Sequence, residues 1–439
     1  MTAPTPTHRN TRPGRTTATR RRVRALAASS RERVFDVYAS PRLLHPLDRL
    51  VLARASRRRT GTTFEDDAPH LLVCPPGAGN VGDQAMVEAF LRGTVGPVVL
   101  LVRDVDDVEV PSEHAARVRV LGLRDLVYGG GPAHVRDVAR FAALLGTARS
   151  VSVVGADLMD GGYGHRPASH LAFLVDVAAR RGLPSRVLGF SWSATPHRAC
   201  VRALARAGHR GTRLLARDPQ SAQRMRDAGM SGVEDVVDTV FSAADDLDPS
   251  LTDGLLDGAG DAPVVVVNAS GLVGARMEQL GDYVVAVEHL RRRGALVVLL
   301  PHVQRPGGDD VAEVRRLADR FAGDPGVLLV DGLPHPAQVR GLVDRADAVL
   351  TGRMHLAVMA LSRGVPAVCL STQGKVDGLM EVFGTPTLSV PPRPGMGAEL
   401  ARLLDDVLDG RVGASTDLRA RAAHARTLSG VNFTGLDAA

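Results

Sequence analysis

Residues 351–384 contain two basic residues and a histidine that could bind an anion. Arg353 and His355 follow a short apolar run that predicts a buried strand, and Lys375 follows the next such run. The apolar residues between them predict a helix. A β-α-β arrangement of this kind brings all three side chains to the carboxyl edge of a parallel sheet, where ligands bind. Because arginine and a helix N-terminus both favour negative charge, the segment predicts a carboxylate or phosphate site.

Lys375 is the only lysine among the 54 lysine and arginine residues of the chain. The general replacement of lysine by arginine indicates mutational pressure from a GC-rich genome. A lysine kept against that pressure indicates a position that needs a compact ammonium group. The alternative is chance retention on a surface loop.

Polar residues in the first half of the chain also follow predicted strands. Asn80 and Asp83 lie in a glycine-rich turn that leads into a helix, so they either face a ligand or form an ordinary turn. The turn matches neither the Walker A loop nor the dinucleotide-binding GxGxxG pattern.

A second glycine-rich loop, residues 155–164, carries Asp157 and Asp160 at the end of a predicted strand. These acids could bind sugar hydroxyls or a metal, or serve as turn residues. Trp192 follows another strand, where it could stack on a sugar or pack in the core. Arg217 also follows a strand and could add to an anion site.

Composition excludes several classes of protein. The net charge is +6, but the first sixty residues supply more than all of it, and the remainder is mildly acidic. Aromatic residues make up 3%, too few for platforms that stack single-stranded nucleic acid, so we expect no nucleic-acid partner.

The cysteines Cys74, Cys200 and Cys369 are widely separated and have neither zinc-binding spacing nor the density of a disulfide framework. The sequence has no apolar run long enough for a transmembrane helix and no secretory signal. We therefore expect a cytoplasmic protein, and we assign no cofactor and no metal site.

The N-terminal residues 1–60 predict an arginine-rich arm, disordered at first and helical over 32–59 with breaks at Pro41 and Pro46. Its basic flanks could contact the anionic inner face of a membrane. The alternatives are a solvated arm and a helix packed on the main body.

Strands and helices alternate through the rest of the chain, which predicts two Rossmann-like parallel-sheet domains facing a cleft. We place the domains at 61–250 and 251–430, with a Gly- and Asp-rich linker at 247–263.

Five segments together, in this order, resemble the polysaccharide pyruvyl transferase family across roughly residues 70 to 385. They are GNVGDQAM at 79–86, VVGADLMDGGYG at 153–164, ARDPQS at 216–221 with DTVF at 238–241, PHVQRPGGDD at 301–310, and GRMHLAVMALSRGVP at 352–366 with KVDG at 375–378. The resemblance implies a fold like that of GT-B glycosyltransferases. It also implies transfer of the enolpyruvyl unit of phosphoenolpyruvate onto two hydroxyls of a sugar, in a cell-surface polysaccharide or its lipid-linked precursor. The products are a pyruvate ketal and phosphate.

The resemblance also suggests roles for the residues. The reaction delivers a proton to the methylene carbon of phosphoenolpyruvate, which suits a histidine. His355 is the first candidate for this acid and His302 the second. The candidates for holding phosphoenolpyruvate are Arg353, Lys375 and Arg217. The candidates for facing the acceptor are Asn80, Asp83 and Asp157.

Two alternatives remain open at this stage. One is a nucleotide-sugar glycosyltransferase of the same architecture, in which Asp377 or Glu381 would hold a ribose. The other is a non-catalytic glycan-binding protein, against which the presence of Arg353, His355 and Lys375 together argues.

Overall fold

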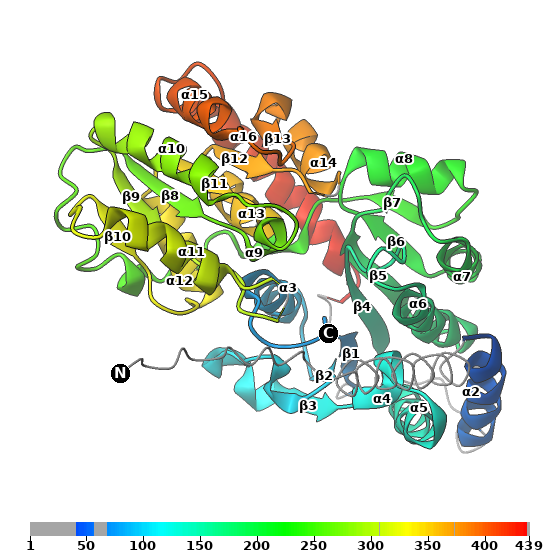
Figure 1. Cartoon of the computed structure of the whole chain (residues 1–439). Helices are drawn as coiled ribbons and strands as arrows, with labels where there is room; N and C mark the ends of the chain where they lie inside the picture. The colour runs from blue at the N-terminus through cyan, green and yellow to red at the C-terminus, as the bar shows by residue number, and fades with distance from the viewer. Residues whose placement is uncertain (1–40, 57–67, 307, 373, 437–439) are drawn as a thin grey trace, which may run out of the picture.

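The computed structural model describes residues 41–56, 68–306, 308–372 and 374–436. Its strands form a seven-stranded sheet and a six-stranded sheet, each with helices packed beside it (Figure 1). The predicted pair of Rossmann-like parallel-sheet domains is confirmed.

The first sheet has the strand order β3-β2-β1-β4-β5-β6-β7, with every neighbouring pair parallel. Its strands are β1 His70–Val73, β2 Val98–Val102, β3 Val118–Gly122, β4 Ser150–Ala156, β5 Ser185–Phe190, β6 Arg213–Ala216 and β7 Val233–Asp235. Its helices are α3 Val81–Arg92, α4 Arg124–Tyr128, α5 Gly131–Leu145, α6 His165–Arg180, α7 Arg198–Gly208 and α8 Pro219–Asp227. The central strands are buried along their whole length, as expected where helices cover both faces. We call these elements the N-terminal unit.

The second sheet has the order β10-β9-β8-β11-β12-β13 and is also parallel throughout. Its strands are β8 Val264–Asn268, β9 Leu296–Leu299, β10 Val327–Leu329, β11 Ala348–Thr351, β12 Ala367–Leu370 and β13 Ser389–Val390. Its helices are α9 Gly271–Gly274, α10 Leu280–Arg292, α11 Asp310–Ala318, α12 Pro336–Asp344, α13 Met354–Ser362, α14 Lys375–Val382 and α15 Gly397–Leu408. We call these elements the C-terminal unit.

The two units meet at the loops that follow their strands. The strand order reverses between β1 and β4 in one sheet and between β8 and β11 in the other, and such switch points open crevices at the carboxyl ends of strands. Asn80, after β1, forms an isolated antiparallel bridge with Val303, after β9. The Val81 N–H donates to the His302 carbonyl at 3.1 Å. The loop after the switch-point strand β1 therefore contacts the loop after β9, which neighbours the switch-point strand β8.

The C-terminal helix α16 (Ser415–Gly430) returns to the N-terminal unit. It packs against α13 and against the 3₁₀ segment Thr239–Ala243. Beyond it, the Asn432 side chain accepts a hydrogen bond from Gly189 N–H at 2.9 Å and donates to the Val237 carbonyl at 3.1 Å. The tail therefore ties the two units together. The predicted division at residue 250 stays a prediction.

Part of the predicted N-terminal arm is an ordered helix on the main body. Helix α2 (Pro41–Ser56) packs against α5 and α6 and buries Leu44 and Leu52. The predicted break at Pro46 is wrong, because the helix continues through it. This apolar burial offsets the backbone hydrogen bond that a proline inside a helix removes.

Residues 1–40 and 57–67 lie outside the described residues, so membrane contact through the arm stays a prediction. None of the described helices is long and apolar enough to cross a bilayer.

Candidate active site between the two sheets

The sequence-predicted residues come from loops that follow different strands of the two sheets. Asp157 follows β4, Arg217 follows β6, Arg353 and His355 follow β11, and Lys375 begins α14 after β12. The structure joins several of them in ion pairs across the interface of the two units.

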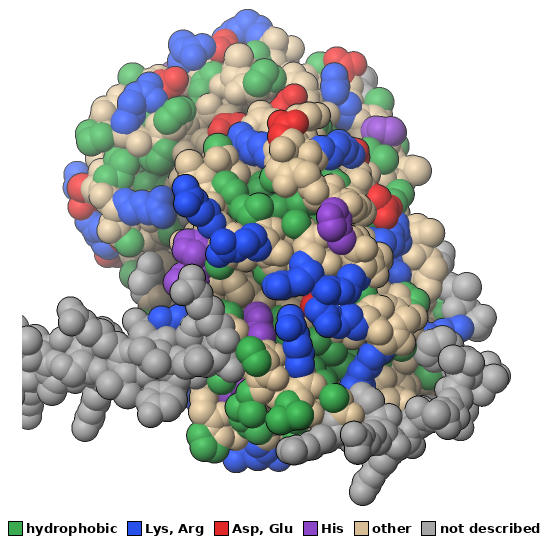
Figure 2. Space-filling model, turned by 90° about the vertical axis from the view of Figure 1, so that its right-hand side faces the viewer, with side chains coloured by type: hydrophobic (Ala, Val, Ile, Leu, Met, Phe, Trp, Pro, Cys, Tyr) green, Lys and Arg blue, Asp and Glu red, His purple; other side chains and the backbone are tan. Residues whose placement is uncertain are grey.

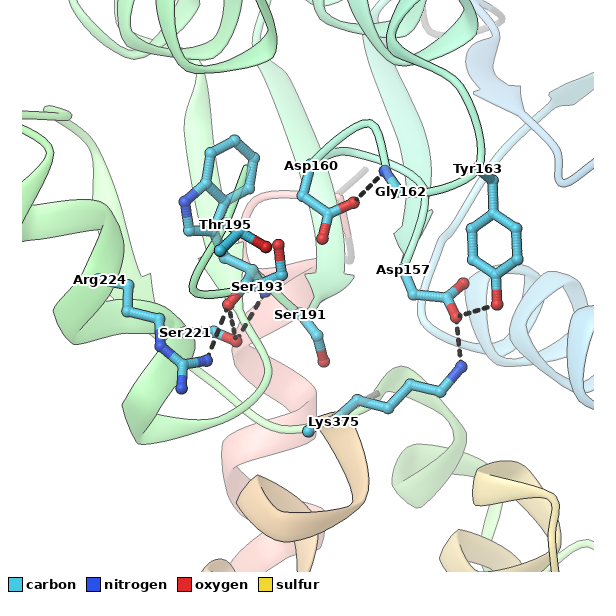
Figure 3. A pocket seen from close by; sticks show the side chains of 12 residues that line it. Asp157, Asp160, Gly162, Tyr163, Ser191, Ser193, Thr195, Ser221, Arg224 and Lys375 are labelled. Atoms are coloured by element: carbon cyan, nitrogen blue, oxygen red, sulfur yellow. Dashed lines mark hydrogen bonds and ion pairs between the residues drawn. The ribbon is translucent and has the colours of Figure 1, made fainter. Parts of the chain in front are cut away.

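Lys375 and Asp157 form an ion pair between the two units. The Tyr163 hydroxyl also donates to Asp157 Oδ2, at 3.2 Å (Figure 3). Burial would raise the pKa of Asp157, but Lys375 and Arg217 outweigh that effect and lower the pKa to about 2. Asp157 is therefore an anion over the physiological range, and the lysine neutralises it.

Arg217, Asp238 and His355 form a second group. Arg217 Nη1 lies 2.7 Å from Asp238 Oδ2, and both side chains are at most 3% exposed. His355 Nε2 lies 3.5 Å from the same oxygen. Burial would raise the pKa of Asp238, but His355 and Arg217 hold it well below its usual range. The buried carboxylate can therefore orient the His355 ring.

Gly82 makes close contact with the His355 ring from the N-terminal unit. A Cβ atom at Gly82 would lie 2.2 Å from His355 Nδ1. Only glycine leaves room for the imidazole here, so the first turn of α3 forms one wall of the histidine site.

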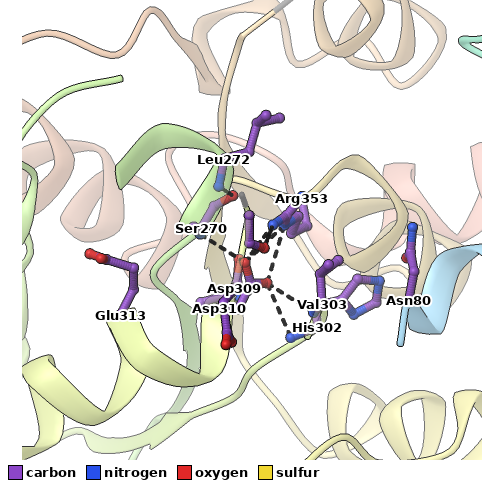
Figure 4. Close-up of polar contacts among 12 residues, drawn as sticks. Asn80, Ser270, Leu272, His302, Val303, Asp309, Asp310, Glu313 and Arg353 are labelled. Atoms are coloured by element: carbon purple, nitrogen blue, oxygen red, sulfur yellow. Dashed lines mark hydrogen bonds and ion pairs between the residues drawn. The ribbon is translucent and has the colours of Figure 1, made fainter. Parts of the chain in front are cut away.

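Arg353 is held by the buried carboxylate of Asp310 (Figure 4). Its Nη2 donates to Asp310 Oδ1 at 2.6 Å and to the Gly308 carbonyl at 2.7 Å, and its Nε lies 3.0 Å from Asp310 Oδ1. Asp310 also accepts from Asn268 and from the Gly271 N–H. Arg353 thus organises the loops after β8, β9 and β11, and its binding of phosphoenolpyruvate stays a prediction.

His302, the second candidate acid, is 1% exposed. Neither ring nitrogen has a hydrogen-bond partner among the described residues. Burial, together with the neighbouring His355 and Arg353, lowers the pKa of His302 well below its usual value. This setting suits a neutral core histidine better than a proton donor.

Asn80 and Asp83 hold the interface of the two units. The Asn80 side chain caps α3 by accepting from the Gly82 N–H at 3.0 Å. Asp83 pairs at 2.7 Å with Arg305 of the C-terminal unit. Burial raises the pKa of Asp83, and Arg305 opposes that rise. Contact of these two residues with an acceptor stays a prediction.

A cavity of about 280 Å³ adjoins the Lys375–Asp157 pair (Figure 3). Arg224 of α8 lines it and donates to two neutral acceptors, the Trp192 carbonyl and Gln220 Oε1. The α14 N-terminus also lines it at Gly374, which has no side chain to cap the helix. Beside the carboxylates of Asp157 and Asp160, the cavity therefore offers an ammonium, a guanidinium and the N-terminus of α14, which favour an anion.

Trp192 is 1% exposed and packs edge-to-face on Phe190, with ring centroids 6.4 Å apart. It belongs to the core, although it is also one of the residues that line the cavity. The core alternative for this residue is therefore confirmed, and a stacked sugar would need the ring to become exposed.

Sequence reasoning did not assign roles to Asp238, Asp310, Tyr163 or Arg224. Asp238 precedes the 3₁₀ segment Thr239–Ala243 and Asp310 begins α11. Both residues, and Tyr163, lie within quoted segments of the resemblance, so that signal was available. Arg224 is in the middle of α8, and nothing in the sequence distinguishes it from the exposed Arg226 on the same helix.

Solved structures with a similar fold are enzymes of nucleotide-sugar and sugar-phosphate metabolism. The UDP-GlcNAc 2-epimerase from Neisseria meningitidis bound to UDP-GlcNAc matches with a TM-score of 0.54 and 10% identity, over 84% of this chain and 99% of that one. The UDP-GlcNAc 2-epimerase from Methanocaldococcus jannaschii matches with a TM-score of 0.53 and 12% identity, over 81% and 99%. Sucrose-phosphate synthase from Thermosynechococcus elongatus matches with a TM-score of 0.50 and 13% identity, over 83% and 94%. At these identities the matches show the fold alone, and that fold is GT-B-like.

A search of curated proteins found no significant match. The family model for polysaccharide pyruvyl transferase matches residues 80–374. This range includes Arg217, Asp238, His355 and every residue of the cavity except Lys375, which directly follows it. The chain therefore belongs to the polysaccharide pyruvyl transferase family.

Proposed function

We propose that the chain transfers the enolpyruvyl unit of phosphoenolpyruvate onto two hydroxyls of a sugar, forming a pyruvate ketal and releasing phosphate. The acceptor is a cell-surface polysaccharide or its lipid-linked precursor. The observation that carries this proposal is the cavity between the units, where Lys375, Arg224 and the α14 N-terminus converge beside the carboxylate of Asp157.

Phosphoenolpyruvate carries a phosphate and a carboxylate, so its site needs more than one positive group. All three predicted cations pair with a carboxylate. Arg217 and Arg353 pair with the buried Asp238 and Asp310, whereas Lys375 pairs at the cavity with Asp157, whose side chain is 22% exposed. Arg224 donates to neutral acceptors and can turn its guanidinium to a ligand without leaving a carboxylate unpaired. We therefore propose that Lys375 and Arg224 are the main contacts of the anion. Arg217 and Arg353 would position the surrounding loops through their pairs with Asp238 and Asp310.

His355 is the proposed acid. A proton from its ring passes to the methylene carbon of phosphoenolpyruvate, which leaves a cation at C2 that one sugar hydroxyl attacks. Loss of phosphate leaves a second cation at C2, and attack by the second hydroxyl completes the ketal. Of the two hydroxyl protons, one restores the His355 ring and the other leaves with the phosphate. His355 does not line the cavity, whereas Lys375 does. An anion that draws Lys375 away from Asp157 would open a path between His355 and the cavity. The Asp157 carboxylate, no longer paired, could then accept a hydroxyl proton.

Binding of the donor can be tested without knowing the acceptor. Trp192 is the only tryptophan of the chain and touches the cavity, so its fluorescence reports ligand binding there. We expect phosphoenolpyruvate to change this fluorescence with saturation. Lys375→Met and Arg224→Gln should each weaken the affinity roughly 10- to 100-fold, the value of one lost charged contact. Arg226→Gln is the matched control, since Arg226 is on the same helix and pairs with Asp235 outside the cavity.

The chemical step is tested by incubating phosphoenolpyruvate with a mixture of lipid-linked glycans and measuring phosphate release and the ketal by mass spectrometry. His355→Ala should bind phosphoenolpyruvate normally and form no ketal. Saturable binding of a nucleotide diphosphate sugar with no binding of phosphoenolpyruvate would refute the proposal and favour a glycosyltransferase. Binding of glycans with neither donor bound would favour a non-catalytic protein.

A further inference from the structure

Three buried side chains with metal-binding atoms meet where α2 packs on α5 and α6. They are Asp48 of α2, His134 of α5 and His170 of α6, and they are 0%, 1% and 2% exposed. One ligand atom from each lies within 4.8 Å of the others. None of them lines the cavity beside Lys375. We propose that these three residues bind one zinc ion, which fastens α2 to the N-terminal unit.

The hydrogen bonds of His134 require a positive species at this position. His134 Nδ1 lies 2.9 Å from the Asp125 carbonyl, which can only accept, so Nδ1 carries the hydrogen. In a neutral imidazole the lone pair is then on Nε2. That nitrogen lies 3.1 Å from Asp48 Oδ1, which is also an acceptor. Two acceptors this close need a proton or a metal ion between them.

The geometry fits a metal ion. Two ligands of a tetrahedral zinc with bonds of about 2.0 Å lie about 3.3 Å apart, close to the separation of His134 Nε2 and Asp48 Oδ1. A zinc-binding histidine commonly donates its other ring N–H to a carbonyl, as His134 does to Asp125. The site therefore has the outer hydrogen bond that fixes the tautomer needed for binding.

A proton alone would leave part of the cluster unexplained. It would make His134 an imidazolium paired with Asp48 Oδ1. Asp48 Oδ2, however, has no hydrogen-bond partner among the described residues, although the side chain is fully buried. An unpaired buried carboxylate oxygen is costly. A zinc ion would balance this carboxylate and also engage His170.

A third histidine, His45, packs beside the proposed site. His45 packs on Phe173, with ring centroids 4.2 Å apart, and lies edge-on to His170 at 5.0 Å.

Basic side chains gather on the surface of this side of the molecule (Figure 2). Arg180 and Arg210 there both pair with the buried carboxylate of Asp176. A basic surface does not attract cations in general, so a bound cation would have to be held by specific ligands. Two imidazoles and one carboxylate suit zinc, whereas magnesium and calcium prefer oxygen ligands alone.

The test uses the full chain with any affinity tag removed, expressed in zinc-containing medium and passed over a chelating resin. Elemental analysis should find about one zinc per chain in the wild type. Asp48→Asn should lose most of it, because asparagine keeps the shape but not the charged ligand. His209→Ala is the control, since His209 lies on the surface at the end of α7 and bonds to Ser231.

A second measurement uses only the wild type, so that its result does not depend on whether Asp48→Asn folds. Chelator-stripped wild type is titrated with zinc alone, and its melting temperature should rise by several degrees. Titration with cobalt(II) should produce visible absorption of a low-coordinate nitrogen and oxygen site. Wild type that is metal-free as purified and gives no response to zinc or cobalt would overturn the proposal. The cluster would then be a proton-bridged pair of His134 and Asp48. Binding of phosphoenolpyruvate in the fluorescence assay is separate from this result.

Discussion

Replacing Gly82 with alanine tests whether the contact between the two units positions His355. Gly82 is the second residue of α3, and a Cβ there would lie 2.2 Å from His355 Nδ1, 2.5 Å from Cγ and 2.7 Å from Cβ. Non-bonded carbon atoms prefer about 3.5–4.0 Å, so the atoms must separate by roughly 1 Å. Rotation of the imidazole cannot relieve the contact with its own Cβ. Either α3 or α13 must therefore move.

The size of the effect follows from this geometry. Overpacking of this kind costs about 1–3 kcal/mol of unfolding free energy. At about 2–4 °C per kcal/mol for a unit of this size, the melting temperature should fall by roughly 2–12 °C. A shift of about 1 Å at the proposed acid should slow ketal formation about 100-fold. Affinity for phosphoenolpyruvate should change much less, because Lys375 and Arg224 lie elsewhere in the site.

Gly281→Ala is the matched control. Gly281 is also the second residue of its helix, α10, but a Cβ there has no atom within 4 Å among the described residues. Alanine at such a position is neutral or stabilises by up to about 1 kcal/mol. Thermal unfolding, fluorescence titration and ketal formation are measured for both variants beside the wild type. If Gly82→Ala melts like Gly281→Ala and keeps full activity, the proposed coupling of the two units at His355 is refuted.

Two further predictions concern the buried carboxylates. Asp238→Asn breaks the pair with Arg217, whose side chain is 3% exposed, and should lower the free energy of unfolding in urea by about 3–5 kcal/mol. In the control Asp235→Asn, at an exposed ion pair, the loss should be at most about 1 kcal/mol. Equal losses in the two variants would contradict the burial argument. Asp157 has its pKa lowered from 3.8 to about 2, so its contribution to stability is present above pH 3.8 and is lost as the pH falls through about 2. Unfolding measured across this range should be less pH-dependent in Asp157→Asn, and an unchanged profile would show that the Lys375 pair does not persist in solution.

Several features could be predicted from the sequence because they depend on local pattern. Buried parallel strands are continuous apolar runs, and the residue types after them mark the carboxyl edges of the sheets. For this reason Asp157, Arg217, His355 and Lys375 could be named and assigned to one interface before the fold was known. The quoted segments also carried the family resemblance, which the family model confirms.

Other features depend on which atoms meet in space. The sequence offers Arg353 and Lys375 equally as candidate cations. In the structure the buried Asp310 holds Arg353 through three hydrogen bonds, while Lys375 lines a cavity. The burial of His302 by its neighbours and the position of Arg224 on a helix that lines the cavity also depend on such contacts.

The sequence by itself therefore determined the fold class, the family and the sheet edge that carries the candidate site, because these follow from apolar periodicity and residue type. Only the tertiary structure decided which cations are already neutralised, and that Asp48, His134 and His170 share one buried site. Asp48 is 86 residues from His134 along the chain, so no local pattern could reveal their contact. Long-range packing decides which side chains are paired and buried. Pairing and burial in turn determine whether a charged side chain is available to bind a ligand.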